Sequence, residues 1–337
     1  MRAAMLYAPR EMRLAEVERP KIGPNDVLIK VRAVGICGTD VSMYEGTYPE
    51  HHLPMIIGHE FAGEVVETGN EVKGIENGNC VTAEPSWGCG SCEFCRIGEE
   101  NLCRNAVHMG RNRAGALADY VAVPSDVIHL LPPGVSCEDG QEIITLACAV
   151  RAARRCRIGL GNVAAVLGAG HVGLLLIQVL KTVGVDSVFA TDMKKNRLNL
   201  AKSLGADLTL DIGEDPDVVK TVLQRTGEGV DYVFEATGVA AALRQALLMV
   251  KKGGTVVIVG IHKKDMDRFR IQDFYLKELT MIGVRGGIGG YSTAVRLLAS
   301  RRIEVKPLIT HTTPLEEIQR AFQAFGQEDY IRGIVKP

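Results

Sequence analysis

Four of the chain's nine cysteines lie close together in the stretch GCGSCEFCRIGEENLC, which covers residues 88–103. Gaps of two, two and seven residues separate them, in the order Cys89, Cys92, Cys95 and Cys103. Two-residue gaps let successive thiolates point into one small sphere, and a further thiolate from a loop completes a tetrahedron around zinc. An iron–sulfur cluster is the main alternative, because cysteine thiolates hold those too, and a disulfide pair is a third. The spacing favours a closed structural zinc site, which leaves no position open for a substrate.

A second set of metal-ligating residue types is spread more widely along the chain. Cys37 lies in GICGTD, and His59 and Glu60 are adjacent in IIGHEF. One thiolate, one imidazole and one carboxylate can hold a zinc ion that keeps a position open for an oxygen ligand, as catalytic zinc does. Each residue also has a simpler interpretation: a buried core thiol, a hydrogen-bonded histidine and a solvated acid.

The stretch VAAVLGAGHVG has the glycine pattern of a dinucleotide-binding turn at Gly168, Gly170 and Gly173. An apolar strand precedes the pattern and an apolar helix follows it, which is the context that such a turn requires. The glycines allow a tight turn, close approach to a pyrophosphate, and close packing of helix against strand. The next strand ends in Asp192, whose carboxylate would bind the ribose hydroxyls and repel a 2′-phosphate, which favours NAD over NADP. Nearby basic residues weaken that preference: Lys194, Lys195 and Arg197.

These residues fall in two parts of the chain that differ in pattern. Up to about residue 135 the sequence consists of short strand-like runs interrupted by Gly and Pro, such as the alternating DVLIKVRAVG, and it predicts an irregular, mostly β domain. From about residue 163 strands and helices alternate, with one helix expected through VAAALRQALLMVKKGG, which predicts a doubly wound parallel sheet and an α/β fold class. We expect a first domain over residues 1–150 with a metal-binding lobe at 88–103, a dinucleotide-binding domain over 151–289, and a return to the first domain over 290–337.

The overall composition is that of a globular protein with more than one core. The chain has 337 residues, of which 46% are hydrophobic and 23% charged, and a formal net charge of −1; two domains are typical of that length. Because there is no basic patch and no apolar run of about 18 residues, nucleic acid and membranes are not expected partners. The N-terminal stretch MRAAMLYAPREMRLAEVERP carries charges throughout and has no apolar signal core, so we expect a cytoplasmic protein.

Six motifs occur in an order that spans nearly the whole chain: GICGTD, GHEFAGEVVETGNEV, CGSCEFCRIGEENLC, VLGAGHVGLL, FEATG and KKGGTVVIVG. With these motifs the chain resembles the zinc-dependent medium-chain dehydrogenases/reductases, and among them the branch of polyol, threonine and butanediol dehydrogenases. The resemblance implies a GroES-like, mostly β catalytic domain and a Rossmann domain, with the active site in the cleft between them. It also implies a homodimer or a homotetramer.

The resemblance assigns roles to individual residues. It implies a catalytic zinc at Cys37 and His59, with Glu60 as a direct or alternate ligand. It implies that Thr39 hydrogen-bonds the substrate oxygen, so that zinc would act on that oxygen as a Lewis acid and Thr39 would pass the proton outward. Hydride would go to the nicotinamide ring of NAD. The implied cofactor contacts are Gly168, Gly170, His171, Val172, Gly173, Asp192, Arg197, Thr237 and Ile261.

Two positions depart from the family pattern. Ile144, in QEIITLACAV, stands where this branch often has the glutamate of a Glu-Pro-Leu stretch as a third protein ligand, and isoleucine cannot bind zinc. Its neighbours Glu142 and Cys148 are out of register, and we expect a solvated acid and a core thiol there. The catalytic zinc is then completed by water or is held weakly. Ser42 stands where many relatives have a histidine that continues the proton relay, so the proton would leave through the hydroxyl, water or a cofactor ribose.

We therefore expect an enzyme that transfers hydride between NAD and a secondary alcohol, a polyol or a hydroxy amino acid, with one structural and one catalytic zinc. Among enzymes, the alternative is a reductase of the same family that uses NADPH. In a different class, the alternative is a non-catalytic NAD-binding protein that has lost its catalytic metal, for which Ile144 is the reason. The substrate itself does not follow from the sequence, because specificity depends on the shape of the pocket.

Overall fold

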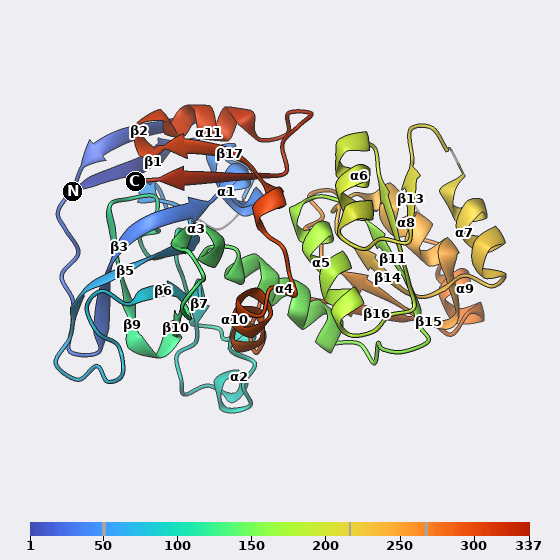
Figure 1. Ribbon diagram of the computed structural model, residues 1–337, viewed down its shortest axis with the longest axis horizontal. Coiled ribbons are helices and arrows are strands. Elements are labelled where there is room, and N and C mark those ends of the chain that lie inside the picture. The colour runs from blue at the N-terminus through green and yellow to red at the C-terminus, as the bar shows by residue number, and fades with distance from the viewer. Residues whose placement is uncertain (49–51, 216, 267–268) are drawn as a thin grey trace. The chain divides into compact units, whose positions relative to one another are not determined.

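The computed structural model describes all of the chain except residues 49–51, 216 and 267–268. The chain forms two compact units. The first consists of Met1–Ala147, Ile288–Arg301 and Val305–Pro337, and the second of Cys148–Gly287 and Arg302–Glu304. The main divisions thus fall after Ala147 and Gly287, near the expected ones after residues 150 and 289. Among the described residues, the first unit holds three sheets and the second unit one (Figure 1), and each unit has its own hydrophobic core.

The first unit is mostly β, as predicted. Its strands are β1 (Arg2–Ala8), β2 (Glu11–Glu16), β3 (Asp26–Gly35), β4 (Met55–Ile56), β5 (Glu60–Thr68), β6 (Cys80–Ala83), β7 (Ser86–Trp87), β8 (Val107–His108), β9 (Tyr120–Pro124), β10 (Ile128–Leu130), β17 (Ile309–Pro314) and β18 (Arg332–Lys336). The largest sheet has the order β10-β6-β5-β3-β18-β17, with β9 also paired to β3. A three-stranded sheet has the order β2-β1-β4, and β7 pairs with β8.

The central strand of the first unit is β3, which brings distant parts of the chain together. It pairs with β5 and β9, and the C-terminal strand β18 joins it through Ile334 opposite Gly35 and Val335 opposite Val34. The apolar residues Ile29, Val31 and Ala33 along β3 are buried, as their alternation with Lys30 and Arg32 predicts. The last strand of the chain therefore lies beside the strand that leads into the GICGTD motif.

The helices of the first unit are short. They are α1 (Gly38–Tyr44), α2 (Glu93–Arg96), α3 (Cys137–Gly140), α10 (Tyr291–Ala299) and α11 (Ile318–Ala324). A longer helix, α4 (Ile143–Arg154), begins in this unit and continues into the second, because the division falls after Ala147. The part of the chain that the structure describes contains no helix that is both long enough and apolar enough to cross a membrane.

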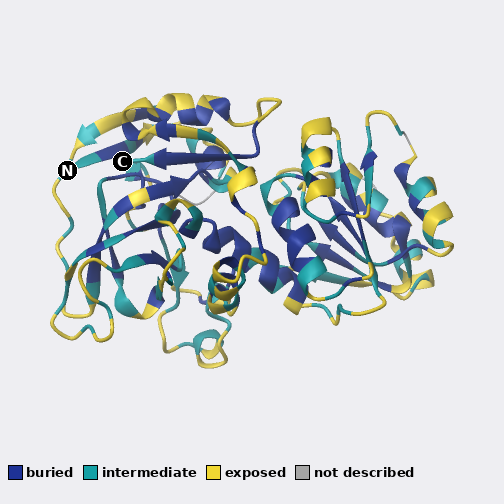
Figure 2. Ribbon diagram, viewed as in Figure 1, coloured by how far each residue is buried: buried dark blue, intermediate teal, exposed yellow. Residues whose placement is uncertain are grey.

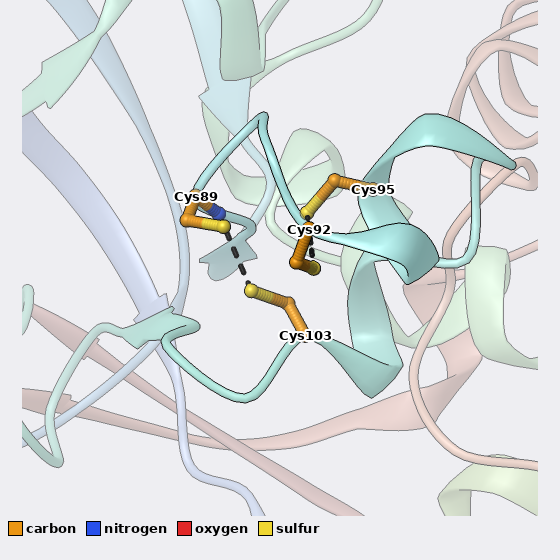
Figure 3. A group of neighbouring side chains, drawn as sticks. All are labelled: Cys89, Cys92, Cys95 and Cys103. Carbon is orange, nitrogen blue, oxygen red and sulfur yellow. Dashed lines mark hydrogen bonds between the residues drawn. The ribbon is translucent and has the colours of Figure 1, made fainter.

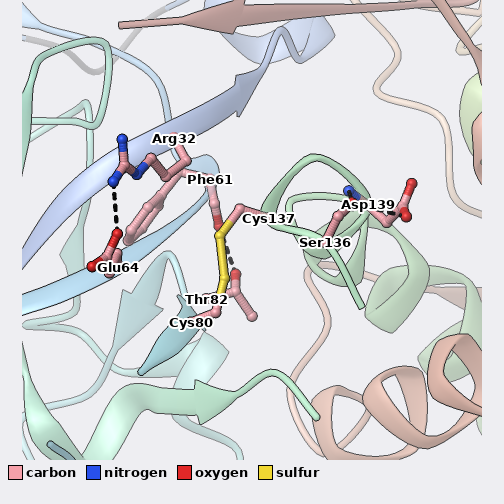
Figure 4. The surroundings of a disulfide bond; sticks show 8 residues. All are labelled: Arg32, Phe61, Glu64, Cys80, Thr82, Ser136, Cys137 and Asp139. Carbon is pink, nitrogen blue, oxygen red and sulfur yellow. Dashed lines mark hydrogen bonds and ion pairs between the residues drawn. A yellow bond between two sulfur atoms is a disulfide. The ribbon is translucent and has the colours of Figure 1, made fainter. Parts of the chain in front are cut away.

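A disulfide between Cys80 and Cys137 joins β6 to the start of α3 (Figure 4). The two cysteines are 57 positions apart in sequence, and their Cα atoms are 6.6 Å apart. The loop that it closes contains the four-cysteine stretch and strands β7 to β10. Cysteine spacing did not predict this bond, because neither residue belongs to a cluster.

The second unit is the predicted doubly wound parallel sheet. Its strands are β11 (Val163–Leu167), β12 (Ser187–Asp192), β13 (Leu208–Asp211), β14 (Val230–Glu235), β15 (Val250–Ile258) and β16 (Thr280–Gly283), and its helices are α5 (His171–Thr182), α6 (Lys195–Ser203), α7 (Val218–Thr226), α8 (Ala240–Met249) and α9 (Ile271–Leu276). The strand order is β13-β12-β11-β14-β15-β16, with every pair parallel. The strands are largely buried between helices (Figure 2), which explains their continuous apolar runs.

Two boundaries differ from the sequence-based expectation. The helix predicted to run through VAAALRQALLMVKKGG ends at Met249, and β15 begins at Val250. The strand begins there because Val250 pairs with Val230 of β14, and an irregularity in the β14–β15 register follows this pair. The C-terminal segment does not return whole to the first unit, since Arg302–Glu304 belong to the second. Gln178 on α5 explains this: its side chain donates to the Glu304 carbonyl (3.0 Å) and accepts from the Glu304 N–H (2.7 Å).

Candidate active site and cofactor site

Cys37 lies at the start of α1, where a helical turn fixes its position. It is the residue before the first helical one, and its backbone N–H donates to Asp40 Oδ2 at 3.0 Å. An acidic side chain on the third residue of a helix commonly accepts the N–H of the residue before the helix, and this bond stabilises the helix start. Thr39 follows on the same turn and is half-buried. Ser42 is buried, and its hydroxyl donates to the Gly38 carbonyl at 2.9 Å.

His59 is oriented by the same aspartate. Its Nδ1 atom is 3.1 Å from Asp40 Oδ1, which also accepts the Gly58 N–H at 3.2 Å. With Nδ1 on a carboxylate, the ring leaves Nε2 for a metal, which is the usual arrangement of a zinc-binding histidine. Burial opposes protonation of His59, but Asp40 outweighs burial and raises the pKa of His59 well above its ordinary value. Asp40 therefore links the segments that carry two of the predicted ligands.

Glu60, at the start of β5, is buried beside a fully buried arginine from the C-terminal strand. Its Oε2 atom is 2.5 Å from Arg332 Nη1, and its Oε1 atom is 3.9 Å from His59 Nε2. Arg332 also donates to Glu142 Oε1 (3.1 Å) and Gln141 Oε1 (2.5 Å). Burial opposes a charge on Arg332, but the two carboxylates outweigh burial and raise its pKa. Glu60 is thus held by Arg332 and presents its other oxygen toward His59.

The three predicted ligands of the catalytic zinc come together in the first unit. The Cys37 sulfur, a His59 ring nitrogen and a Glu60 oxygen all lie within 4.8 Å of one another. Burial and the Glu60 charge raise the pKa of the Cys37 thiol. A divalent cation would reverse this effect, because a coordinating thiol is deprotonated. One sulfur, one nitrogen and one oxygen at this separation fit a zinc ion with an open position.

The region around Ile144 differs from the expectation. Ile144 is buried on α4 and offers no ligand atom. Glu142 was expected to be a solvated acid, but it is 0% exposed, because it accepts hydrogen bonds from Arg332 and from Gln141 Nε2 (2.6 Å). Cys148 is half-buried. Among the described residues, neither Glu142 nor Cys148 joins the group of converging ligand atoms.

Two residues of this site were missed by reasoning from the sequence. Asp40 had a usable signal, because it lies three positions after Cys37 within GICGTD and so can accept the N–H at the helix start. Arg332 had none, since it lies 296 positions after the Ile36 carbonyl to which its Nη1 donates. Only the pairing of β18 with β3 brings the arginine to the site.

The four clustered cysteines form a second convergent group in the first unit (Figure 3). The sulfur atoms of Cys89, Cys92, Cys95 and Cys103 lie within 4.8 Å of one another. Two backbone N–H groups point at Cys103 Sγ, from Cys89 at 3.3 Å and from Asn105 at 3.4 Å. A short helix, α2, carries Cys95, and Cys103 follows a 3-10 turn at Glu100–Leu102. The two-residue gaps thus bring the sulfurs together, as the spacing predicts.

The protonation of this cluster also fits a cation. Hydrogen bonds from Ser91 and from neighbouring backbone groups lower the pKa of Cys89 to about 6. Burial and a hydrogen bond with Cys92 raise the pKa of Cys95 to about 12. Without a metal Cys89 and Cys95 therefore do not ionise together, whereas one divalent cation would hold all four cysteines as thiolates. Four sulfurs would also leave a zinc ion no open position.

The glycine turn of the second unit has the shape that a dinucleotide needs. Gly168 has φ of +96°, and a Cβ there would lie 2.7 Å from Thr237 Cγ2. A Cβ on Gly173 would lie 1.9 Å from the Gly168 carbonyl oxygen. Gly170 precedes the first turn of α5, and the nearest atom to a Cβ there is Arg197 Nη1 at 3.8 Å. His171 and Val172 are the first residues of this twelve-residue helix, and the start of such a helix is where a dinucleotide-binding turn receives a pyrophosphate.

Asp192 lies at the carboxyl end of β12, beside the glycine turn. Its Oδ2 accepts the Ala169 N–H at 2.8 Å, and its Oδ1 accepts the N–H groups of Met193 (2.8 Å) and Lys194 (3.0 Å). Arg197 Nη1 is 4.0 Å from Asp192 Oδ2. The structure therefore places the predicted ribose ligand and the predicted basic neighbour side by side at the turn.

Thr237 and Ile261, the last two predicted cofactor contacts, follow β14 and β15. Thr237 lies against Gly168, and Ile261 is 65% exposed. Between them lies Glu235, a fully buried acid to which the sequence motifs assign no role. The second unit thus gathers all nine predicted cofactor residues at the carboxyl ends of β11, β12, β14 and β15, the edge at which open α/β sheets bind ligands.

Comparisons with known proteins agree with both halves of this description. Residues 23–133 match the model of the alcohol dehydrogenase GroES-like domain, and residues 172–300 match that of the zinc-binding dehydrogenases. The sorbitol dehydrogenase of Bombyx mori is 34% identical over 328 residues, which cover 95% of this chain and 93% of that protein. The L-threonine 3-dehydrogenase of Alteromonas mediterranea is 34% identical over 323 residues, 93% of this chain and 92% of that one.

A solved structure shows the same fold over the whole chain. The structure from Sinorhizobium meliloti 1021, described as a zinc-binding dehydrogenase bound to NADP, has a TM-score of 0.95 and 32% sequence identity, and it covers 100% of this chain and 99% of its own. The motif-based resemblance and the predicted fold class are thereby confirmed. The chain belongs to the zinc-dependent medium-chain dehydrogenase/reductase family, in its polyol dehydrogenase branch, and is an oxidoreductase that depends on zinc and a nicotinamide cofactor.

Proposed function

We propose that the protein oxidises a secondary alcohol, a polyol or a hydroxy amino acid with NAD, and catalyses the reverse reduction. The observation that carries this proposal is the convergence of Cys37, His59 and Glu60 within 4.8 Å, in the unit that matches the alcohol dehydrogenase domain. The sorbitol and threonine dehydrogenases similar to this chain support a small hydroxylated substrate. We extend the proposal to a cytoplasmic homodimer or homotetramer.

Two zinc ions per chain are proposed, with different roles. The cluster of Cys89, Cys92, Cys95 and Cys103 would hold a structural ion, since four thiolates close the coordination sphere. The group of Cys37, His59 and Glu60 would hold the catalytic ion and leave one position for water or substrate, because Ile144 supplies no further ligand. Arg332 competes for Glu60 from the opposite side, so we propose that Cys37 and His59 hold the ion more firmly than the carboxylate does.

NAD is proposed as the cofactor because Asp192 stands at the turn. Its carboxylate already accepts three backbone N–H groups, which fix its position at the turn. A fixed negative charge there favours ribose hydroxyls and repels a 2′-phosphate. Gly168, Gly170 and Gly173 would leave room for the pyrophosphate at the start of α5.

The chemistry divides between the two units. When bound, the catalytic zinc supplies a Lewis acid that makes the substrate hydroxyl more acidic. Thr39 would hydrogen-bond that hydroxyl and take its proton outward. The Ser42 hydroxyl donates to the Gly38 carbonyl, so the proton would continue from Thr39 through water or a cofactor ribose. NAD, held by the glycine turn and Asp192, would supply the hydride acceptor for the substrate carbon, which would become a carbonyl, with one proton released for each NADH formed.

A second candidate has a specific observation in its favour. The structure from Sinorhizobium meliloti is bound to NADP, and Arg197 lies 4.0 Å from Asp192 in this chain, where it could pair with a 2′-phosphate. An NADPH-dependent reductase is therefore the alternative. The two proposals predict opposite orders of affinity for NADH and NADPH. Asp192 would make the affinity for NADH the higher of the two.

A substrate screen with metal analysis tests the proposal. Purified protein would be mixed with NAD and a panel of secondary alcohols, polyols and β-hydroxy amino acids, with absorbance at the NADH wavelength as readout and zinc measured by elemental analysis. The expected result is turnover of at least one polyol or hydroxy amino acid, two zinc per chain, and tighter binding of NADH than NADPH. Absence of turnover across the panel in protein that carries one zinc per chain would reject it and favour a non-catalytic NAD-binding protein.

A further inference from the structure

Glu235 is a buried acid to which the proposed chemistry gives no role. It is the last residue of β14 and is 0% exposed. Its Oε1 atom accepts the N–H groups of Thr237 (2.7 Å) and Gly238 (2.9 Å), together with the Thr237 hydroxyl. A fully buried carboxylate is stable only when donors surround it, and these donors account for one of its two oxygens.

His262 supplies a donor for the other oxygen. Its Nε2 atom is 2.9 Å from Glu235 Oε2, and the imidazole is mostly buried. His262 lies in the segment 259–262 that follows β15, whereas Thr237 and Gly238 lie in the segment that follows β14. The carboxylate of Glu235 therefore joins two loops that are far apart in sequence.

The backbones of these two loops are in close contact. The Glu235 carbonyl accepts the N–H groups of Val259 and Gly260, each at 2.9 Å. Gly238 has φ of +70°, and a Cβ on it would lie 2.3 Å from the Ile261 carbonyl oxygen. A Cβ on Gly260 would lie 2.3 Å from the Gly238 nitrogen. Loops that meet backbone to backbone have little freedom as long as both are anchored, and a shift in one moves the other.

The two loops carry the predicted contacts of the cofactor. Thr237 faces Gly168 in the glycine turn, and Ile261 is exposed at the end of the other loop. Backbone hydrogen bonds to the Glu235 carbonyl hold this segment at Val259 and Gly260, and His262 is tied down beyond Ile261 by its bond to Glu235. Ile261 is therefore held on both sides, by Gly260 before it and by His262 after it.

We propose that His262 is a positioning residue, which acts through Glu235 to hold Thr237 and Ile261 in place for the cofactor. This inference rests on the proposed NAD-dependent function for the identity of the ligand, but the tie between the loops exists without any ligand. Loss of the bond would leave a buried carboxylate oxygen without its donor and free the segment after Gly260. The expected consequences are faster exchange in both loops and weaker binding of the nicotinamide cofactor.

Two variants and a matched control test this role. His262→Phe keeps a ring but removes the donor, and His262→Gln keeps a donor at a similar reach. His129→Phe is the control, because His129 Nε2 makes the same kind of bond, 3.0 Å from Glu84 Oε1, at similar exposure in the first unit. Hydrogen–deuterium exchange of the cofactor-free proteins would follow peptides covering 236–239 and 259–262, and fluorescence titration would give the Kd for NADH.

Support for the inference is faster exchange in both segments of His262→Phe and a Kd for NADH raised about tenfold, with His262→Gln close to wild type and His129→Phe unchanged in both readouts. Wild-type exchange and affinity in His262→Phe would overturn it. Equal losses of NADH affinity in His262→Phe and His262→Gln, together with faster exchange over the whole second unit, would also overturn it. That result would show that His262 has a purely structural role. If the wild-type protein binds no NADH, the proposed function fails, and the exchange measurement still decides whether His262 ties the loops.

Discussion

Arg332 and Glu60 form a buried ion pair in which Nη1 and Oε2 are 2.5 Å apart. One partner lies on the C-terminal strand β18 and the other begins β5, and β3 separates the two strands in the sheet. The arginine also pairs with Glu142, in the segment just before α4. A single cation from the end of the chain therefore neutralises an acid of the zinc site and an acid beside the position where a ligand was expected.

Replacing this arginine should destabilise the first unit strongly. In Arg332→Met the carboxylates of Glu60 and Glu142 lose their buried partner, and removal of one side of such a pair costs about 3–5 kcal/mol. Urea unfolding of wild type and variant would measure the loss of unfolding free energy. Arg320→Met is a suitable control, because Arg320 forms an exposed pair with Glu317 that should contribute less than about 1 kcal/mol. Equal stabilities of the two variants would contradict the buried network.

The glycine turn should not accept even one methyl group at Gly173. A Cβ there would lie 1.9 Å from the Gly168 carbonyl oxygen, so Gly173→Ala must push the turn away from the helix. We expect binding of NADH to weaken by at least about tenfold, or about 1.4 kcal/mol, as measured by titration. Gly159→Ala is the control, because a Cβ at Gly159 would meet no atom within 4 Å and this residue does not have a positive φ, and it should leave NADH binding unchanged. NADH binding at wild-type strength in Gly173→Ala would show that the turn has another shape.

The fold could be predicted well wherever a pattern repeats locally. The alternation of strands and helices after residue 163 gave the parallel sheet, and the glycine pattern located the turn between β11 and α5. Both metal groups were also predicted, because their ligand types cluster or sit in short motifs, and the structure brings each group together. These signals are confined to a few neighbouring residues, which is why one sequence was enough to find them.

The parts that could not be predicted depend on pairings between distant residues. Glu142 looked like a solvated acid because its partner Arg332 lies 190 positions away. The bond between Cys80 and Cys137 spans 57 positions and involves no cysteine motif. The bond between Glu235 and His262 spans 27 positions and depends on β14 and β15 being adjacent in the sheet. Strand order decides such contacts, and no local pattern shows it.

Asp231 should make the stability of the second unit dependent on pH in the acid range. Burial opposes its ionisation, but Lys251 and the Val163 N–H (2.7 Å from Oδ2) outweigh burial and lower the pKa of Asp231. A carboxyl whose pKa is lowered on folding stabilises the protein above its unfolded pKa of about 3.9, and this contribution is lost as the pH falls through the lower folded value.

Asp231→Asn tests this dependence. We expect it to cost about 1 kcal/mol at pH 7, and the difference from wild type should shrink as the pH falls below about 4. Urea unfolding between pH 7 and pH 3 would follow the difference. If the difference in unfolding free energy between wild type and Asp231→Asn stays constant over this range, Asp231 is not the source of the pH dependence.

The disulfide between Cys80 and Cys137 should stabilise the first unit. A bond that closes a loop of this length restricts the unfolded chain, and its removal typically costs about 2–5 kcal/mol. The double variant Cys80→Ser, Cys137→Ser should therefore unfold at lower urea concentration than wild type. Cys156→Ser is the control for this double variant, because Cys156 is a free cysteine. Burial raises the pKa of the Cys156 thiol to about 12, so this thiol should react slowly with an alkylating reagent. Alkylation of Cys80 in the folded, unreduced wild-type protein would show that the bond is not formed.

The most direct test of the proposed enzyme is the zinc content of two single-ligand variants, measured together with turnover. Cys37→Ser removes a ligand of the proposed catalytic ion and Cys103→Ser one of the proposed structural ion. We predict two zinc per chain and NAD-dependent turnover in the wild type, and one zinc per chain in each variant. Turnover should be lost in Cys37→Ser, while Cys103→Ser loses stability first. Two zinc per chain and unchanged turnover in Cys37→Ser would contradict the account.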